Sequence, residues 1–137
     1  MTTAADVTDL ILDAFRVAWG STTPIAWPNG RFDVDTDVPD REYGFVRVTV
    51  QYADGEFAGL GTDVEIRGGF VIVQIFTGEG TGPAIHDAHV ESALRWLATW
   101  PRNAVTMRGP SAVSVGNDGG GWWQTNVTAE FEYRTTP

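Results

Sequence analysis

The feature that most constrains this chain is a regular alternation of apolar and polar residues between positions 123 and 133. Successive side chains of a β-strand point to opposite sides of the sheet, so this pattern predicts a long strand with one buried face. We expect Trp123, Val127 and Phe131 to lie in the core, whereas Trp122 points to the other side. A strand of this kind needs further elements that cover its apolar face.

Two amphipathic helices can provide that cover. Apolar residues recur at spacings of three and four between Val7 and Ala18, and Thr3 or Asp6 is a suitable N-cap for this helix. A second helix is predicted from Pro83 to Thr99, because proline suits a first helical turn. The same periodicity therefore predicts two helices that bury one stripe each.

Four further strands are predicted, and a fifth segment is marginal. Alternation indicates a strand near residues 43–52, and the segment from Val64 to Phe76 is apolar on both faces over its second half, as in a central strand. Two short strands, Val105–Met107 and Ser111–Val115, flank a predicted Arg-Gly-Pro turn. The proline-flanked segment Ile25–Trp27 is at most a short edge strand.

Together these elements predict the α+β class: a mostly antiparallel sheet of about five strands with two helices packed on one face. At 137 residues the chain has the length of a single domain, which we place at residues 1–137. The longest apolar run, from Phe70 to Val73, is too short to cross a bilayer, so no membrane association is expected.

Three glycines, Gly78, Gly80 and Gly82, precede the second helix with a spacing that resembles a phosphate-binding loop. Such a loop needs a lysine after its last glycine, and this chain contains none. We therefore interpret the glycines as residues that adopt positive φ in a tight reversal from strand to helix. No nucleotide or other cofactor is predicted.

No catalytic or metal-binding pattern stands out. Cysteine is absent, and the histidines, His86 and His89, lie three residues apart on a helix without a third ligand at a recognisable spacing. We expect one of them at the surface and the other half-buried. Asp33, Asp35 and Asp37 resemble the start of a calcium loop, but the glycine and glutamate that such a loop requires are missing. The sequence therefore does not predict an enzyme.

The net charge of −9 argues against a protein that grips nucleic acid, because that binding requires cationic side chains that displace counterions from phosphates. The more informative residues are apolar ones in unexpected places. Trp19 and Trp122 fall outside the main apolar stripes, and Phe57 and Leu60 lie in a glycine-rich connection. With Arg67, these residues are the candidates for an interface, and the aromatic ones would equally suit a sugar-binding face.

The order of motifs resembles the small tail terminator, or tail completion, proteins of long-tailed phages and gene transfer agents. The resemblance runs from about Val7 to Arg134 and rests on PIAWPNGRF, VRVTV, GGFVIVQIFTGEGTGPA and GWWQTNVTAEFEYR. It implies a structural protein without enzymatic activity or cofactor, built as a sheet with two helices on one face. The acidic stretch from Asp33 to Glu42 departs from the pattern expected for the family.

The resemblance also implies partners and a location. Members of this family form a hexameric ring on the finished tail tube, end its polymerisation and present the surface that joins the head. The implied partners are further copies of the chain, the tail tube protein and the head–tail connector, and DNA passes through the ring without specific binding. The implied location is the head-proximal end of the virion tail, assembled in the host cytoplasm. A small carbohydrate-binding module with an aromatic face is the alternative.

Overall fold

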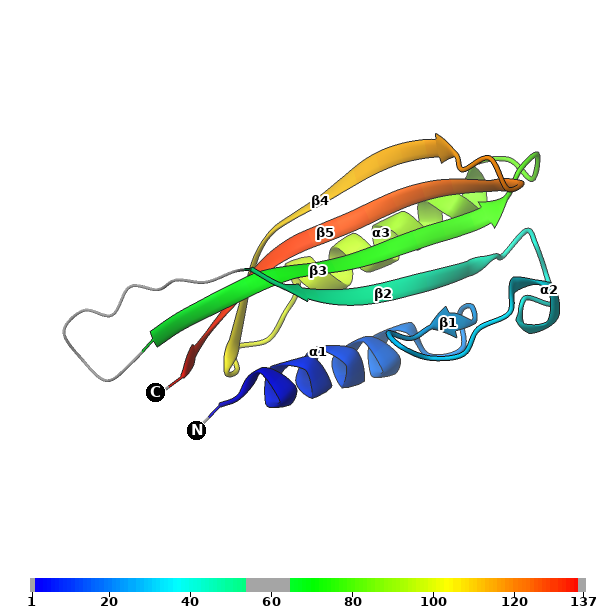
Figure 1. Cartoon of the computed structure of the whole chain (residues 1–137). Helices are drawn as coiled ribbons and strands as arrows, with labels where there is room; N and C mark the ends of the chain where they lie inside the picture. Colours follow the sequence, from blue (N-terminus) through cyan, green and yellow to red (C-terminus); the bar gives the residue numbers. More distant parts are fainter. Residues whose placement is uncertain (1, 54–64, 136–137) are drawn as a thin grey trace.

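The structure is a computed structural model that describes residues 2–53 and 65–135. Its elements are, in chain order, α1 (Ala4–Trp19), β1 (Ile25–Ala26), α2 (Val34–Asp37), β2 (Phe45–Tyr52), β3 (Glu65–Gly78), α3 (Ala84–Ala98), β4 (Val105–Asn117) and β5 (Trp122–Thr135). These elements form one sheet with helices packed against it (Figure 1).

The five strands lie in the order β1-β2-β3-β5-β4. The β2–β3, β3–β5 and β4–β5 pairs are antiparallel, and β1 joins the edge of β2 in parallel. The predicted α+β class is therefore confirmed, with a sheet that is mixed rather than purely antiparallel. β1 corresponds to the marginal edge segment, and it is short because prolines lie on both sides of it.

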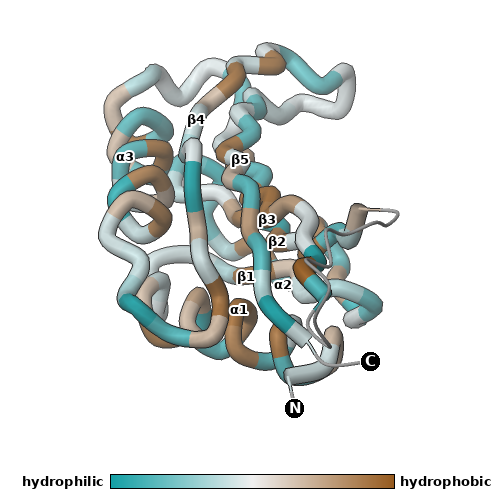
Figure 2. Tube along the Cα trace, turned by 90° about the vertical axis from the view of Figure 1, so that its left-hand side faces the viewer, coloured by the Kyte–Doolittle hydropathy of each residue, from teal (hydrophilic) through white to brown (hydrophobic). Residues whose placement is uncertain are grey.

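The main core lies between the sheet and the two long helices. The fully buried side chains alternate along the strands and recur at helical spacing in α1 and α3, as the sequence pattern predicts. Examples are Val7, Ile11 and Phe15 on α1, and Val127 and Phe131 on β5. Apolar residues gather where α1, α3 and the strands meet (Figure 2).

The start of α1 is fixed by both of the residues proposed as its cap. The Asp6 main-chain N–H donates to Thr3 Oγ1 at 3.2 Å, and the Thr3 N–H donates to Asp6 Oδ2 at 3.0 Å. This reciprocal capping box satisfies two main-chain donors that the first turn leaves without partners. These hydrogen bonds lower the pKa of Asp6.

Two elements differ from the prediction. The segments predicted as two strands around a turn form one strand, β4, which pairs with β5 along its length. The Arg-Gly-Pro sequence is a bulge in this strand, between Arg108 and Ser111, where Gly109 takes a φ of 64°. The short helix α2 was not predicted, because four residues are too few to show a helical periodicity.

A second, smaller core lies on the opposite side of the sheet, at the end near α2. Val38, Phe45, Phe76 and Trp122 are buried there, with Phe32 and Val34 packed against them. The rings of Phe45 and Phe76 stack at 4.6 Å, and the ring of Trp122 meets Phe45 edge-on at 5.1 Å. The loop that carries α2 therefore covers this end of the sheet.

The two adjacent tryptophans of β5 have the opposite exposure to the one predicted. Trp122 is 7% exposed, because the small core and the Arg41 guanidinium, 4.4 Å from its ring, cover it. Trp123 is 45% exposed, so its predicted place in the main core is wrong. Its ring lies beside Gly116 of β4, which has no side chain to cover it. The alternation itself is confirmed from Thr125 onward.

Candidate interaction surfaces

Trp19 is not available for an interface in the isolated chain. Its side chain is 4% exposed, stacks on Phe15 with ring centroids 5.4 Å apart, and donates a hydrogen bond to Thr23 Oγ1 at 3.0 Å. The expectation that Trp19 is exposed is wrong, because the chain that follows α1 folds back and satisfies the indole N–H. With Trp122 also buried, two of the five candidate interface residues lie inside the protein.

The other three candidates have different outcomes. Phe57 and Leu60 lie outside the described residues. Arg67 lies near the start of β3 with about half of its side chain exposed, and its Nη2 is 3.0 Å from Glu65 Oε2. Its charge is therefore partly compensated by a neighbour on the same strand, and an exposed pair of this kind contributes little to stability.

The histidines form the most organised polar group in the described part of the chain. His86 is 2% exposed and spans two strands: Nδ1 is 2.8 Å from Thr77 Oγ1 and Nε2 is 2.7 Å from Thr125 Oγ1. Nε2 of His89 lies 2.9 Å from the Tyr43 carbonyl oxygen and therefore carries a proton, because a carbonyl only accepts. These bonds tie α3 to β3, β5 and the chain before β2.

The prediction of one surface and one half-buried histidine is wrong, because both are buried. Burial away from water lowers the pKa of each imidazole, since desolvation disfavours the charged form. Nearby Asp87 acts in the opposite direction on His86, but the effect of burial is larger. Both rings are therefore neutral structural groups at neutral pH.

Within residues 2–53 and 65–135, no three His, Asp or Glu side chains are grouped in a way that could hold a metal ion. The acidic residues around α2 instead cap the local main chain. Asp33 Oδ1 accepts a hydrogen bond from the Asp35 N–H at 3.0 Å, and Asp37 Oδ2 accepts one from the Asp33 N–H at 2.8 Å.

Two of the three glycines before α3 adopt the predicted positive φ, whereas Gly78 does not and is the last residue of β3. Gly80 and Gly82 have φ values of 86° and 87°, which L-residues with a side chain rarely adopt. The N–H groups of Glu79 and Thr81 donate to the carbonyls of Gly121 and Gly78. Because these N–H groups already have hydrogen-bond partners within the protein, we interpret the loop as a turn that connects β3 to α3.

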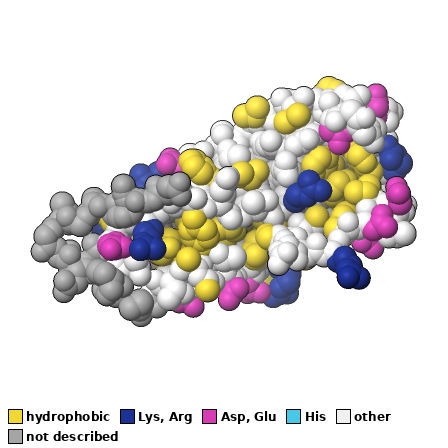
Figure 3. Space-filling view, viewed as in Figure 1, with side chains coloured by type: hydrophobic (Ala, Val, Ile, Leu, Met, Phe, Trp, Pro, Cys, Tyr) yellow, Lys and Arg dark blue, Asp and Glu magenta, His cyan; other side chains and the backbone are white. Residues whose placement is uncertain are grey.

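Beyond the end that the α2 loop covers, the side of the sheet that faces away from α1 and α3 is partly exposed, and we call it the outer face. Residues that are paired from strand to strand form rows across this face. The two rows at its centre are Arg47–Gln74–Asn126–Val113 and Thr49–Ile72–Thr128–Ser111. Only one of these eight side chains is charged. Phe70, 44% exposed, pairs with Glu130 on the same face. Figure 3 shows apolar side chains scattered over this side of the molecule. The centre of the outer face is therefore mostly polar with one charge, Arg47, and the next row adds Glu130 and Arg108.

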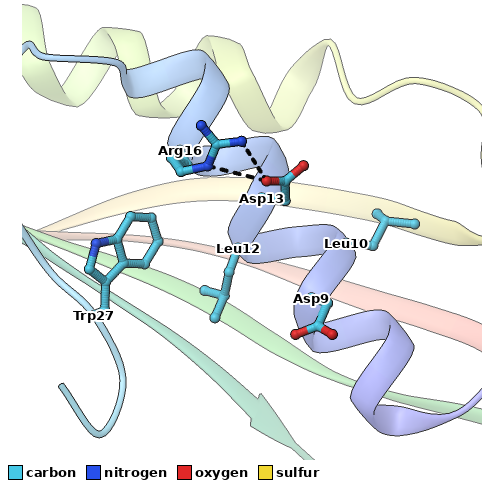
Figure 4. A pocket seen from close by; sticks show the side chains of 6 residues that line it. All are labelled: Asp9, Leu10, Leu12, Asp13, Arg16 and Trp27. Atoms are coloured by element: carbon cyan, nitrogen blue, oxygen red, sulfur yellow. Dashed lines mark hydrogen bonds and ion pairs between the residues drawn. The ribbon is translucent and has the colours of Figure 1, made fainter.

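A shallow groove of about 550 Å³ runs beside α1 on another side of the molecule (Figure 4). Leu12 and Trp27 form its apolar wall, and Asp9 and Asp13 line it together with Leu10 and Arg16. Arg16 Nη2 donates to Asp13 Oδ1 at 2.7 Å. Trp27 was not among the predicted site residues, because proline-rich segments give no periodicity that indicates which side chains face outward.

Comparison with known proteins identifies the fold but not a family. No protein-family model matches the chain, and no curated protein matches it. One solved protein structure is similar over 95% of this chain and 97% of its own, with a TM-score of 0.58 and 17% sequence identity. At this identity the similarity concerns the fold alone. None of the helices in the described ranges is long and apolar enough to span a membrane.

Proposed function

We propose that this protein is a tail terminator of a phage or of a gene transfer agent, a structural subunit that caps the tail tube as a ring. The fold class supports this proposal, because the resemblance implies a sheet with two helices on one face. The motifs of the resemblance also occupy coherent places: PIAWPN includes β1, GGFVIVQIF lies in the central strand β3, and GWWQTNVTAEFEYR forms β5.

The observation that carries the proposal furthest is the outer face. A ring through which DNA moves needs a surface that does not retain phosphates, and binding to phosphates depends on clustered Lys and Arg. The centre of the outer face presents Thr49, Gln74, Asn126 and Thr128, with Arg47 as the one cation of its two rows. We assign this face to the channel of the ring.

The further partners are those that the resemblance implies: other copies of the chain in a hexameric ring, the tail tube protein and the head–tail connector. Phe57, Leu60 and Arg67 remain the proposed contacts with these partners. Trp19 and Trp122 are withdrawn from this set, because both are buried in the chain's own cores.

Negative-stain electron microscopy tests this function on the purified chain, alone and mixed with purified tail tubes. We expect ring-shaped particles and tubes that carry a ring at one end. The double variant Phe57→Ser, Leu60→Ser is expected to remain folded and fail to cap tubes. Val17→Ser is the control, because Val17 is 68% exposed on α1 and should be replaceable. Tubes that never acquire a ring from the wild-type chain would contradict the proposal.

The carbohydrate-binding alternative now rests on the groove beside α1, which Trp27 and the carboxylates of Asp9 and Asp13 line together. An aromatic wall with a few polar groups is a common arrangement in small-molecule sites. Titration of the chain with a panel of oligosaccharides, followed by tryptophan fluorescence, tests this alternative. A saturable change that Trp27→Ala abolishes would favour it over the tail terminator.

A further inference from the structure

The two edges of the sheet are protected to very different degrees. At one edge, β1 pairs with the start of β2, and α1 lies along the rest of that side, where the Tyr52 hydroxyl donates to the Ala4 carbonyl at 2.7 Å. At the other edge, β4 extends over thirteen residues, and no described element lies beyond it (Figure 1). A long open edge presents unpaired N–H and C=O groups that another strand can bind.

The middle of β4 carries no charged side chain, and its four regularly paired residues, Ser111–Ser114, lie between two bulges. Ser111–Val115 has the sequence SAVSV, carries no charge, and is exposed at all five positions. Of the six large apolar side chains that are exposed among the described residues, two lie on this strand: Val113 and Val115. Clustering of this kind marks an interaction surface more often than scattered exposure does.

We propose that β4 of one copy pairs antiparallel with β4 of a second copy, across a two-fold axis near Val113. The main-chain groups of an open edge are complementary to a β-strand, which fixes the kind of occupant. Each copy has one open edge in the part of the chain that the structure describes, so two copies extend their sheets by joining equal edges. A two-fold axis perpendicular to the sheet makes equal strands antiparallel.

The charges around the segment fit this pairing. A chain with a net charge of −9 repels its own copies, so it associates most readily through an uncharged surface. Arg108, which also forms an ion pair with Glu132 of its own chain, precedes Ser111–Val115 by three residues, and Asp118 follows it by three residues. In an antiparallel pair of equal strands, the Arg108 end of one copy lies beside the Asp118 end of the other, so opposite charges meet at both ends.

This contact is independent of the proposed tail function. A two-fold contact joins two copies and then closes, whereas a six-membered ring needs contacts between two different surfaces of each copy. The β4 pair is therefore proposed for the free protein before assembly, and its test does not depend on whether the protein caps tubes.

Sedimentation velocity of the full chain over a range of concentrations tests the pairing. We expect the wild type to form a dimer. Val113→Lys places two like charges opposite each other and should weaken dimerisation by at least about tenfold. Val17→Lys adds the same charge on α1, where Val17 is 68% exposed, and should leave the dimer intact. Circular dichroism and thermal unfolding establish that both variants are folded.

Mixing two variants tests the axis itself. Val113→Lys and Val113→Glu should each be monomeric, and an equimolar mixture should form a heterodimer because opposite charges then face each other. A wild type that is monomeric at all concentrations would overturn the proposal. So would a folded Val113→Lys variant that dimerises like the wild type, or monomeric variants whose mixture does not restore the dimer.

Discussion

The buried cluster of Thr77, His86 and Thr125 offers a quantitative test of the structure. His86→Leu removes both ring nitrogens but keeps an apolar side chain of similar size, so the two threonine hydroxyls lose their partner. A buried polar group without a hydrogen bond costs about 1–3 kcal/mol. His86→Leu should therefore lower the free energy of unfolding by about 2–6 kcal/mol.

The same reasoning predicts strong non-additivity. Thr77→Val keeps the shape of the side chain and leaves only His86 Nδ1 unpaired, so it should cost about 1–3 kcal/mol. The triple variant Thr77→Val, His86→Leu, Thr125→Val leaves none of these groups unpaired. It should therefore be more stable than His86→Leu alone, by about 2–6 kcal/mol, although it carries two more substitutions.

Urea unfolding at pH 8, followed by tryptophan fluorescence and far-UV circular dichroism, measures these differences while the imidazoles are neutral. The slope of the unfolding free energy against urea should be the same for all variants, since the surface exposed on unfolding does not change. If the triple variant is no more stable than His86→Leu, or if His86→Leu costs less than about 1 kcal/mol, the hydrogen-bonded cluster is not as described.

Three further predictions concern stability. Burial lowers the pKa of His86 and His89 below the ordinary value of 6.5, so the unfolded chain binds more protons than the folded chain near that pH. The urea midpoint of unfolding should therefore be constant above about pH 7 and fall as the pH drops through 6.5 toward the lower pKa values of the folded state. Phe131→Ala should cost about 3–5 kcal/mol because Phe131 is 2% exposed, whereas Glu130→Ala on the outer face should change unfolding by less than about 0.5 kcal/mol, and equal losses would contradict the register of β5. Gly69→Ala would place a Cβ 2.0 Å from the Gln51 carbonyl oxygen and push β2 away from β3, which should lower the free energy of unfolding by about 1–3 kcal/mol or more. In Gly120→Ala the added Cβ meets only the Asp118 side chain, at 3.3 Å, so this control should lose clearly less stability in the same assay.

The residues that were predicted correctly are those that repeat a pattern over several turns or several strand positions. Val127 and Phe131 lie in the middle of a long alternation, where each position is supported by its neighbours. Trp123 continues the same alternation, but it lies near the end of β5, where the adjacent β4 residue is a glycine. Periodicity indicates which side of the sheet a side chain faces, but it does not indicate how far along the strand other elements cover that side.

The residues whose exposure was predicted wrongly are buried by contacts between segments that are distant in the sequence. Trp122 is buried by the loop around α2, which lies more than 80 positions earlier in the chain, and Trp19 by the chain that follows α1. His86 is buried because threonines on two different strands offer hydroxyl groups to its ring. None of these partners can be identified from local spacing, because each depends on which strands become neighbours in the sheet.

The order of the strands also determines when the sheet can form. β5 comes after β4 in the chain, yet it lies between β3 and β4, and these two strands are joined only through it. During synthesis, β1, β2 and β3 can assemble early, but β4 has no strand to pair with until residues 122–135 have left the ribosome. A nascent chain that stops before Trp122 would expose the free edges of both β3 and β4, and such edges promote aggregation. The last hairpin is therefore the step that closes the sheet, and premature stops within it should yield aggregated rather than partly functional protein.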